Sequence, residues 1–235
     1  MFNSTSAFRY CKRALRAIAG YDHLLGRDIS VERERIGSDY GGWVVASAPL
    51  RKAERPIVLS FGLGDDISFD REIIGRFAAQ VHGFDPTDES LSWLSSQNLP
   101  EAMHIHPIGI SNFDGTQNFT LPQKEARGNF SAKASSGRCI DLPVMRYSSV
   151  VAMLKISRVD VLKLDVEGSE YDVIPDLLTS TVRPTQILIE FHHRIHRIPV
   201  SQTLAAVELL RKSRYALFDV SPGGRELSFI RRSPD

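Results

Sequence analysis

Two acidic residues, Asp165 and Glu167, lie where the local sequence changes from a strand pattern to a helix pattern. The apolar run before them ends at Leu164, and apolar residues from Tyr171 to Leu178 follow with helical spacing. In an open α/β sheet, ligands bind beyond the carboxyl ends of the strands. Two carboxylates there can take up a proton or hold a cation, and Glu167 can alternatively cap the next helix.

A glycine turn provides a second candidate site. Gly62 and Gly64 follow the apolar run 57–61, a helix is expected over residues 68–80, and a second strand over 81–85 ends in Asp85. Asp85 follows Gly64 by 21 residues. The glycines let the backbone approach a ligand closely, and an acid at the tip of the next strand can accept both ribose hydroxyls. This arrangement indicates a nucleoside ligand.

Two adjacent histidines, His192 and His193, end another apolar strand. Histidine titrates nearest neutral pH, which suits a general base. Because side chains alternate along a strand, one of the two must point away, so at most one is expected to be functional. Glu190, at the tip of the same strand, is expected to pair with Arg194 or Arg183.

The remaining elements alternate between strands and helices, with a hairpin at the end. They are expected as a helix over 86–97, a strand over 103–108, a hairpin over 113–121, a long polar loop over 122–143, a strand over 144–147, helices over 148–156 and 201–213, and a hairpin over 215–230. His104 and His106 alternate on one of these strands and are expected to be packing or edge residues. The order predicts an α/β fold with a mostly parallel sheet and right-handed crossovers.

The domain organisation is predicted as an N-terminal helical extension over residues 1–36 and a single domain over 37–235. In the extension, Cys11, Leu15 and Ile18 fall near one face of a helix whose other faces are basic. We expect this helix to pack on the edge of the domain. A weak peripheral contact with a membrane is the alternative.

Composition bounds the partners and the compartment. The 235 residues are 42% hydrophobic and 24% charged, with a net charge of +1, so a full core is expected and a nucleic-acid partner is not. The two cysteines, Cys11 and Cys139, lack metal-ligand spacing, and no apolar run reaches the ~18 residues of a membrane span. We expect a cytoplasmic protein; the oligomeric state is not indicated.

The segment Val161 to Glu170, with the later segment Ile187 to His192, resembles the FkbM family of methyltransferases. That family shows a K-x-D-x-E-G-x-E element followed by an apolar strand that ends in glutamate and an aromatic residue or histidine. Asp39 to Trp43 and Ser60 to Gly64 are also similar to one branch of the family. The resemblance covers roughly residues 35–195 and implies a Rossmann-like class I methyltransferase fold, with seven mostly parallel strands, helices on both faces and an antiparallel terminal hairpin.

The same resemblance implies S-adenosylmethionine as the methyl donor. By position, Gly62 and Gly64 would line its methionine and ribose, and Asp85 would hold the ribose hydroxyls. Ile110 and Ser111 would lie beside the adenine.

The glycine motif departs from the family pattern at two positions. Ser60 replaces the usual acid and Asp66 replaces the third glycine. Asp66 or Asp70 is therefore the candidate to hold the amino group of the donor.

The resemblance further implies methylation of a hydroxyl group on a sugar, glycan or secondary metabolite. Asp165, Glu167 and His192 are the candidate catalytic residues, with Asp165 facing the sulfonium. Asp165, Glu167 and His192 could together bind a divalent metal, but we expect a metal-free site. The alternatives are a nucleoside-binding module of the same fold without catalysis and a nicotinamide-dependent reductase. The reductase is disfavoured because Ile67 occupies the third glycine of its motif and because its closing strands are usually parallel.

Overall fold

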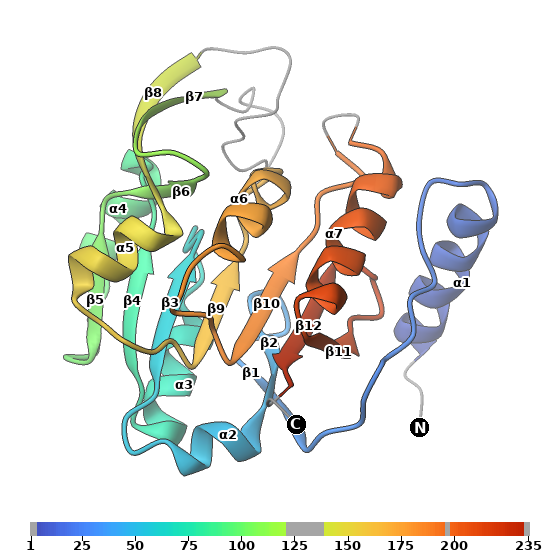
Figure 1. The fold of residues 1–235 in the computed structure, drawn as a ribbon, viewed down its shortest axis with the longest axis horizontal. Helices are drawn as coiled ribbons and strands as arrows, with labels where there is room; N and C mark the ends of the chain where they lie inside the picture. Colours follow the sequence, from blue (N-terminus) through green and yellow to red (C-terminus); the bar gives the residue numbers. More distant parts are fainter. Residues whose placement is uncertain (1–3, 121–138, 196–197, 233–235) are drawn as a thin grey trace.

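The computed structural model describes residues 4–120, 139–195 and 198–232, and its centre is a seven-stranded sheet (Figure 1). The strands stand in the order β11-β12-β10-β9-β3-β4-β5. Five are parallel: β3 (Ile57–Phe61), β4 (Gln80–Phe84), β5 (Met103–His106), β9 (Val161–Leu164) and β10 (Gln186–Glu190). β12 (Glu226–Arg231) runs antiparallel to β10, and β11 (Tyr215–Val220) pairs antiparallel with β12. The predicted mostly parallel sheet with a terminal antiparallel hairpin is confirmed.

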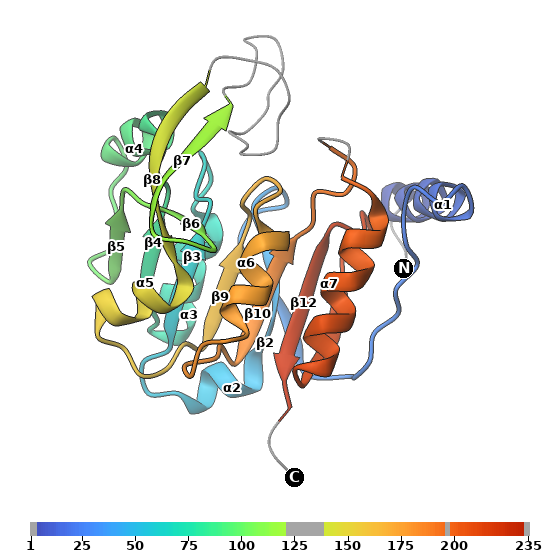
Figure 2. The ribbon, with the colours of Figure 1, turned by 45° about the horizontal axis from the view of Figure 1, so that its top comes forward.

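Both faces of the sheet are buried, which explains why its strands are continuous apolar runs. Along β3, Val58 contributes to one hydrophobic core and the next residue, Leu59, to the other. The first core packs against α5 (Tyr147–Leu154), α6 (Glu170–Leu177) and α7 (Val200–Lys212), which lie in front of the sheet in Figure 2. The second core includes α2 (Ser47–Lys52), α3 (Ser68–Phe77), α4 (Asp88–Ser95) and the hairpin of β1 (Arg33–Ile36) with β2 (Trp43–Ala46).

A second, three-stranded sheet contains β6 (Gly109–Ser111), β7 (Gly115–Thr120) and β8 (Cys139–Arg146). Its order is β6-β8-β7, so β7 pairs with β8 and not with a neighbour inside residues 113–121. The prediction of a hairpin over 113–121 is therefore wrong, as is the loop over 139–143, which belongs to β8. The local pattern missed this pairing because the partner strand is distant in sequence. The rest of the predicted polar loop, 122–138, lies outside the described residues.

The N-terminal helix α1 (Ser4–Ile18) faces the domain differently from the prediction. Leu15 and Ile18 are 69% and 83% exposed, whereas Arg13 is buried. The Arg13 guanidinium donates from Nε to the carbonyl of His23 at 2.9 Å, and this bond holds Arg13 inward while Lys12 stays exposed. None of the helices in the described ranges has both the length and the apolar character needed to cross a membrane.

His104 and His106 lie on the edge strand β5, in agreement with their prediction as packing or edge residues. His82 on the neighbouring β4 is buried beside them. Its Nδ1 lies 3.1 Å from Nε2 of His106. Burial, with further contributions from the neighbouring His106 and His104, lowers the pKa of His82 from 6.5 to about 4. The folded protein therefore holds this imidazole neutral at a pH where the unfolded chain protonates it.

This lowered pKa predicts a loss of stability in mild acid. Above the unfolded pKa of 6.5 the native protein has no penalty, and as the pH falls toward 4 the unfolded state binds the extra proton. Between about pH 7 and about pH 5 the loss from His82 should be on the order of 1–2 kcal/mol, and His82→Gln should remove it. Urea unfolding of both proteins across this range measures the difference. Parallel pH dependences would contradict the burial account.

Candidate active site

The predicted site residues follow three adjacent strands of the main sheet. β9 lies between β3 and β10, and these strands end within one residue of each other: Phe61 pairs with Leu164, and Leu164 pairs with Ile189, the residue before the last of β10. The parallel strands therefore bring the residues that follow them to one edge of the sheet, at the carboxyl ends where α/β proteins bind ligands.

Gly62 makes the closest backbone approach at this edge. Its φ is +77°, and a Cβ on it would lie 1.8 Å from the carbonyl oxygen of Asp165. The buried Lys163 also donates from Nζ to the Gly62 carbonyl at 2.7 Å. Only glycine fits here, and its absence of a side chain lets the end of β3 lie directly against the start of the Asp165 loop.

Gly64 shares the left-handed conformation of Gly62 but has different surroundings. Its φ is +56°, and a Cβ on it would meet no atom within 4 Å among the described residues. The backbone at Gly64 is therefore open to an incoming ligand, whereas the backbone at Gly62 is packed against protein.

Asp85 holds the glycine turn in place. Its Oδ2 accepts from the backbone N–H groups of Leu63 and Gly64 at 3.1 and 3.2 Å, and its Oδ1 accepts from the Thr87 hydroxyl at 2.6 Å. The carboxylate predicted to hold a ribose therefore lies beside the predicted donor turn. In the ligand-free protein it also fixes the shape of that turn.

The other residues predicted to contact the methyl donor are packed against or hydrogen-bonded to the protein itself. Asp66 accepts from the Ser38 hydroxyl and from the backbone N–H of Ser68, each at 2.7 Å, and so ties the 38–41 turn to α3. Asp70, Ile110 and Ser111 are each at most 4% exposed. Ile110 packs in the first hydrophobic core, and burial raises the pKa of Asp70. A direct contact of these residues with a donor stays a prediction.

Four side chains converge beyond β9 and β10, and we call them the acid–histidine cluster: Asp165, Glu167, Glu190 and His192. The Nε2 atom of His192 lies 3.7 Å from Oδ1 of Asp165, 3.5 Å from Oε2 of Glu167 and 3.9 Å from Oε1 of Glu190. The three predicted catalytic residues are thus brought together, and Glu190 joins them. Glu190 pairs with Arg225 at 2.8 Å, so its predicted pairing with Arg194 or Arg183 is wrong.

Glu167 faces this cluster from an unusual backbone conformation. Its φ is +49°, in the left-handed region that costs a non-glycine residue roughly 1–2 kcal/mol. The N-cap of α6 is Ser169, so Glu167 is not the cap that the alternative reading of the sequence allowed. A strained residue aimed at a cluster of polar groups is a candidate for function.

Glu170 holds the backbone of the cluster in place, and the sequence analysis did not identify it as a site residue. It is fully buried, and its two carboxylate oxygens accept from the backbone N–H of Gly168 at 2.8 Å and of His192 at 2.9 Å. The same oxygen that holds His192 N lies 3.2 Å from His192 Nδ1. Glu170 therefore joins the loop after β9 to the loop after β10. The signal was present as the last acid of the K-x-D-x-E-G-x-E element.

The electrostatics of the cluster are set by burial and by its acids. Burial lowers the pKa of His192, but the hydrogen-bonded Glu170 and the carboxylates of Glu167 and Asp165 outweigh it and raise that pKa to about 9. Burial, reinforced by the charge of Asp165, raises the pKa of Glu190 to about 8. At neutral pH in the ligand-free protein, His192 therefore carries a proton and stabilises the neighbouring acids as a cation.

Tyr40, on the 38–42 turn, interacts electrostatically with acids of the cluster. Desolvation of its hydroxyl, together with the charges of Asp65, Asp165 and Glu190, raises the pKa of Tyr40. Its side chain is 82% exposed, so it lies on the solvent side of these acids. The sequence pattern marked the glycines of this turn but not its tyrosine.

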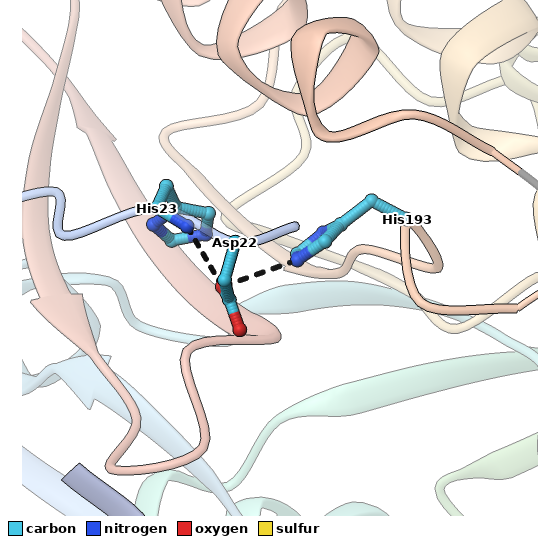
Figure 3. Close-up of side chains that lie close together, drawn as sticks. All are labelled: Asp22, His23 and His193. Atoms are coloured by element: carbon cyan, nitrogen blue, oxygen red, sulfur yellow. Dashed lines mark hydrogen bonds and ion pairs between the residues drawn. The ribbon is translucent and has the colours of Figure 1, made fainter. Parts of the chain in front are cut away.

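His193 points away from the cluster, but it lies in the turn after β10, so its direction does not come from the predicted alternation along a strand. Its Nε2 lies 3.3 Å from Oδ1 of Asp22 and its Nδ1 lies 3.1 Å from the Thr203 hydroxyl. Figure 3 shows Asp22 between His193 and His23, whose backbone N–H donates to the same oxygen at 2.8 Å. Arg194 pairs with the other oxygen of Asp22. This second group, Asp22, His23 and His193, anchors the N-terminal segment to the loop after β10.

Comparison with known proteins identifies the domain type. A family model described as a methyltransferase FkbM domain matches residues 26–217. A search of curated proteins gave no match.

Solved structures with a similar chain path include methyltransferases and related proteins. Fibrillarin of Aeropyrum pernix with natively bound S-adenosyl-L-methionine is 14% identical, with a TM-score of 0.43 over 77% of this chain and 67% of that one. Fibrillarin of Methanococcus jannaschii, a pre-rRNA processing protein, is 11% identical, with a TM-score of 0.47 over 86% and 84%. A 16S rRNA (adenine(1408)-N(1))-methyltransferase from Catenulisporales acidiphilia is 15% identical, with a TM-score of 0.37 over 80% and 90%. These scores are too low to support a conclusion about substrate or mechanism.

The two turn glycines predict different costs for the same substitution. Gly64→Ala should destabilise by about 1–2 kcal/mol, the strain of a left-handed alanine. Gly62→Ala adds the collision with the Asp165 carbonyl, and its total should be about 2–5 kcal/mol. Denaturant unfolding of the two variants measures the difference. Equal losses would show that β3 and the Asp165 loop separate easily.

Glu170→Gln should loosen the link between the two loops. The amide keeps one acceptor but turns a donor toward a backbone N–H, so the protein should lose about 1–3 kcal/mol of stability. Glu89→Gln, an exposed acid in the first turn of α4, is the matched control and should change stability by no more than about 0.5 kcal/mol. Urea midpoints of both variants provide the test. Similar midpoints for the two variants would mean that Glu170 does not stabilise the contact between the loops after β9 and β10.

Proposed function

The chain belongs to the methyltransferase FkbM family, and from this premise we propose that it transfers a methyl group from S-adenosylmethionine to a hydroxyl group of a sugar, glycan or secondary metabolite. The observation that carries the proposal is the juxtaposition of two features on neighbouring strand ends. These are an open glycine turn and a cluster of acids that can take up a proton.

The donor side of the proposal rests on the turn between β3 and α3. The backbone at Gly64 is open, and the adjacent Asp85 carboxylate lies at the tip of the next strand, where a ribose would need a charged acceptor. These features fit a nucleoside with an extended tail. When bound, S-adenosylmethionine supplies a methyl group on a sulfonium, which needs no further activation as a donor.

The acceptor side of the proposal rests on the acid–histidine cluster. The chain aligns the acceptor oxygen for in-line attack, and such positioning can lower the activation free energy by roughly 7–11 kcal/mol. The oxygen must also lose its proton as the new C–O bond forms. His192 already holds a proton at neutral pH in the ligand-free protein, so we assign the proton of the acceptor hydroxyl to Asp165 or Glu167 and give His192 the role of positioning these acids.

The nature of the acceptor remains part of the proposal. A net charge of +1 supports a small molecule or a glycan over a nucleic acid. Membership of a methyltransferase family argues against the nicotinamide-dependent reductase. A location in the cytoplasm and a weak contact of α1 with a membrane stay predictions.

Calorimetry with S-adenosylmethionine and S-adenosylhomocysteine, followed by a methyl-transfer assay, tests the proposal. Both nucleosides should bind, and labelled methyl should appear on hydroxyl acceptors of a panel that also contains amines and thiols. Binding without transfer to any member of a broad panel would support the non-catalytic nucleoside-binding module instead. Absence of binding at millimolar concentration would refute both.

Two variants should separate donor binding from chemistry. Asp165→Asn should lower kcat by about 10²–10⁴-fold, as expected for loss of a proton acceptor, with little change in affinity for S-adenosylhomocysteine. Gly64→Ala should weaken the binding of S-adenosylhomocysteine, because the methyl group of the alanine side chain would occupy the open side of the turn. Calorimetry and saturation kinetics on the same preparations measure both effects. If the two variants lost affinity and rate in the same proportion, the separation of roles would be wrong.

A further inference from the structure

The acid–histidine cluster contains the donor set of a cation site. One oxygen of Asp165, one of Glu190 and a ring nitrogen of His192 all lie within 4.8 Å of one another. The sequence suggested Asp165, Glu167 and His192 as a conceivable set and led us to expect no metal. Glu190 was not in that set, because it was expected to pair with an arginine nearby in the sequence.

One acceptor at the centre of the cluster lacks a hydrogen bond from the described residues, whereas Oε1 of Glu190, which also faces His192, already pairs with Arg225 at 2.8 Å. Oδ1 of Asp165 is shielded from water and accepts no hydrogen bond from any described residue. The His192 side chain is 1% exposed, and its Nε2 approaches the three acids no closer than 3.5 Å, beyond the usual range of about 2.7–3.2 Å. Oδ1 of Asp165 and Nε2 of His192 thus face each other across a gap of 3.7 Å that is too long for a hydrogen bond.

The spacing of these atoms suits a cation between them. Ligands about 2.0–2.2 Å from a metal lie up to roughly 4.4 Å apart when they are opposite each other. The separations of His192 Nε2 from Asp165 and Glu190, 3.7 and 3.9 Å, fall below that limit. Glu170 fixes the backbone and faces the far ring nitrogen of His192, as second partners of metal-bound histidines do.

The second group of the same residue types, around Asp22, provides a contrast. There Asp22 already pairs with the guanidinium of Arg194 and accepts from the backbone N–H of His23. Arg13 lies against the same segment, since it donates to the His23 carbonyl. An arginine thus occupies the place of a cation in the Asp22 group. In the acid–histidine cluster Arg225 pairs with Oε1 of Glu190, but Oδ1 of Asp165 has no hydrogen-bond partner among the described residues.

We propose that Asp165, Glu190 and His192 bind one divalent cation of the Mn²⁺ or Mg²⁺ class, and that this cation coordinates the acceptor hydroxyl. Two carboxylates with one imidazole favour Mn²⁺ over Mg²⁺. Binding of the cation displaces the proton from Nε2 of His192, while Nδ1 stays against Glu170. With Asp165 bound to the cation, Glu167 accepts the proton of the coordinated hydroxyl as the oxygen takes the methyl group and the thioether leaves. The role in catalysis rests on the proposed function, whereas the binding of the cation does not.

A Mn²⁺ titration followed by electron paramagnetic resonance tests the site on protein first treated with a chelator. The full chain should bind one Mn²⁺ per molecule. Asp165→Asn and Glu190→Gln should each weaken that binding by at least about tenfold, and circular dichroism checks that both variants fold. Asp22→Asn, with His23→Gln as a second variant, is the matched control and should leave Mn²⁺ affinity unchanged.

The possible outcomes separate the cation site from the proposed function. Absence of Mn²⁺ binding at millimolar concentration would overturn the site, as would binding that is lost in Asp22→Asn and kept in both cluster variants. Calorimetry with S-adenosylhomocysteine on the same chelated protein measures the donor site independently. Full methyl transfer in the presence of chelator would overturn the cation's catalytic role and leave the methyltransferase intact.

Discussion

The close approach of Gly62 to the Asp165 carbonyl is the constraint on which the rest of the site depends. A Cβ at Gly62 would lie 1.8 Å from that oxygen, so β3 and β9 can end side by side only if this position lacks a side chain. The contact fixes the distance between the glycine turn and Asp165. A donor held by the turn and an acceptor held by the acids therefore meet at a distance set by two packed backbones, which are harder to move than side chains.

A second layer of buried polar contacts holds the two halves of the site. Asp85 fixes the glycine turn through two backbone N–H groups, and Glu170 fixes the loops after β9 and β10 through two others. Asp85 directly follows β4 and Glu170 begins α6, and both accept from backbone donors that would otherwise be unsatisfied. The protein thus uses carboxylates in two ways at this edge: some shape the backbone, and the others face the ligand space.

The sequence predicted what depends on local pattern. The strands ending at Phe61, Leu164 and Glu190 are mostly apolar runs, and the terminal hairpin surrounds a glycine turn, so the mostly parallel sheet with its closing hairpin could be predicted from pattern. The number of seven strands came from the resemblance to the family. Pairings that depend on distant partners could not be predicted locally. β8 extends to Cys139 because β7 lies beside it, and Arg13 turns inward because the His23 carbonyl accepts from it. Glu190 joined the acid–histidine cluster because its arginine, Arg225, comes from the terminal hairpin rather than from the adjacent loop.

The most direct test of the account is a crystal structure with S-adenosylhomocysteine bound. The account predicts that the adenosine lies along the turn at Gly64 with its ribose at Asp85, and that the sulfur faces the acid–histidine cluster across the space where a methyl group would be transferred. A nucleoside bound at another edge of the sheet, or a sulfur pointing away from Asp165 and His192, would contradict it.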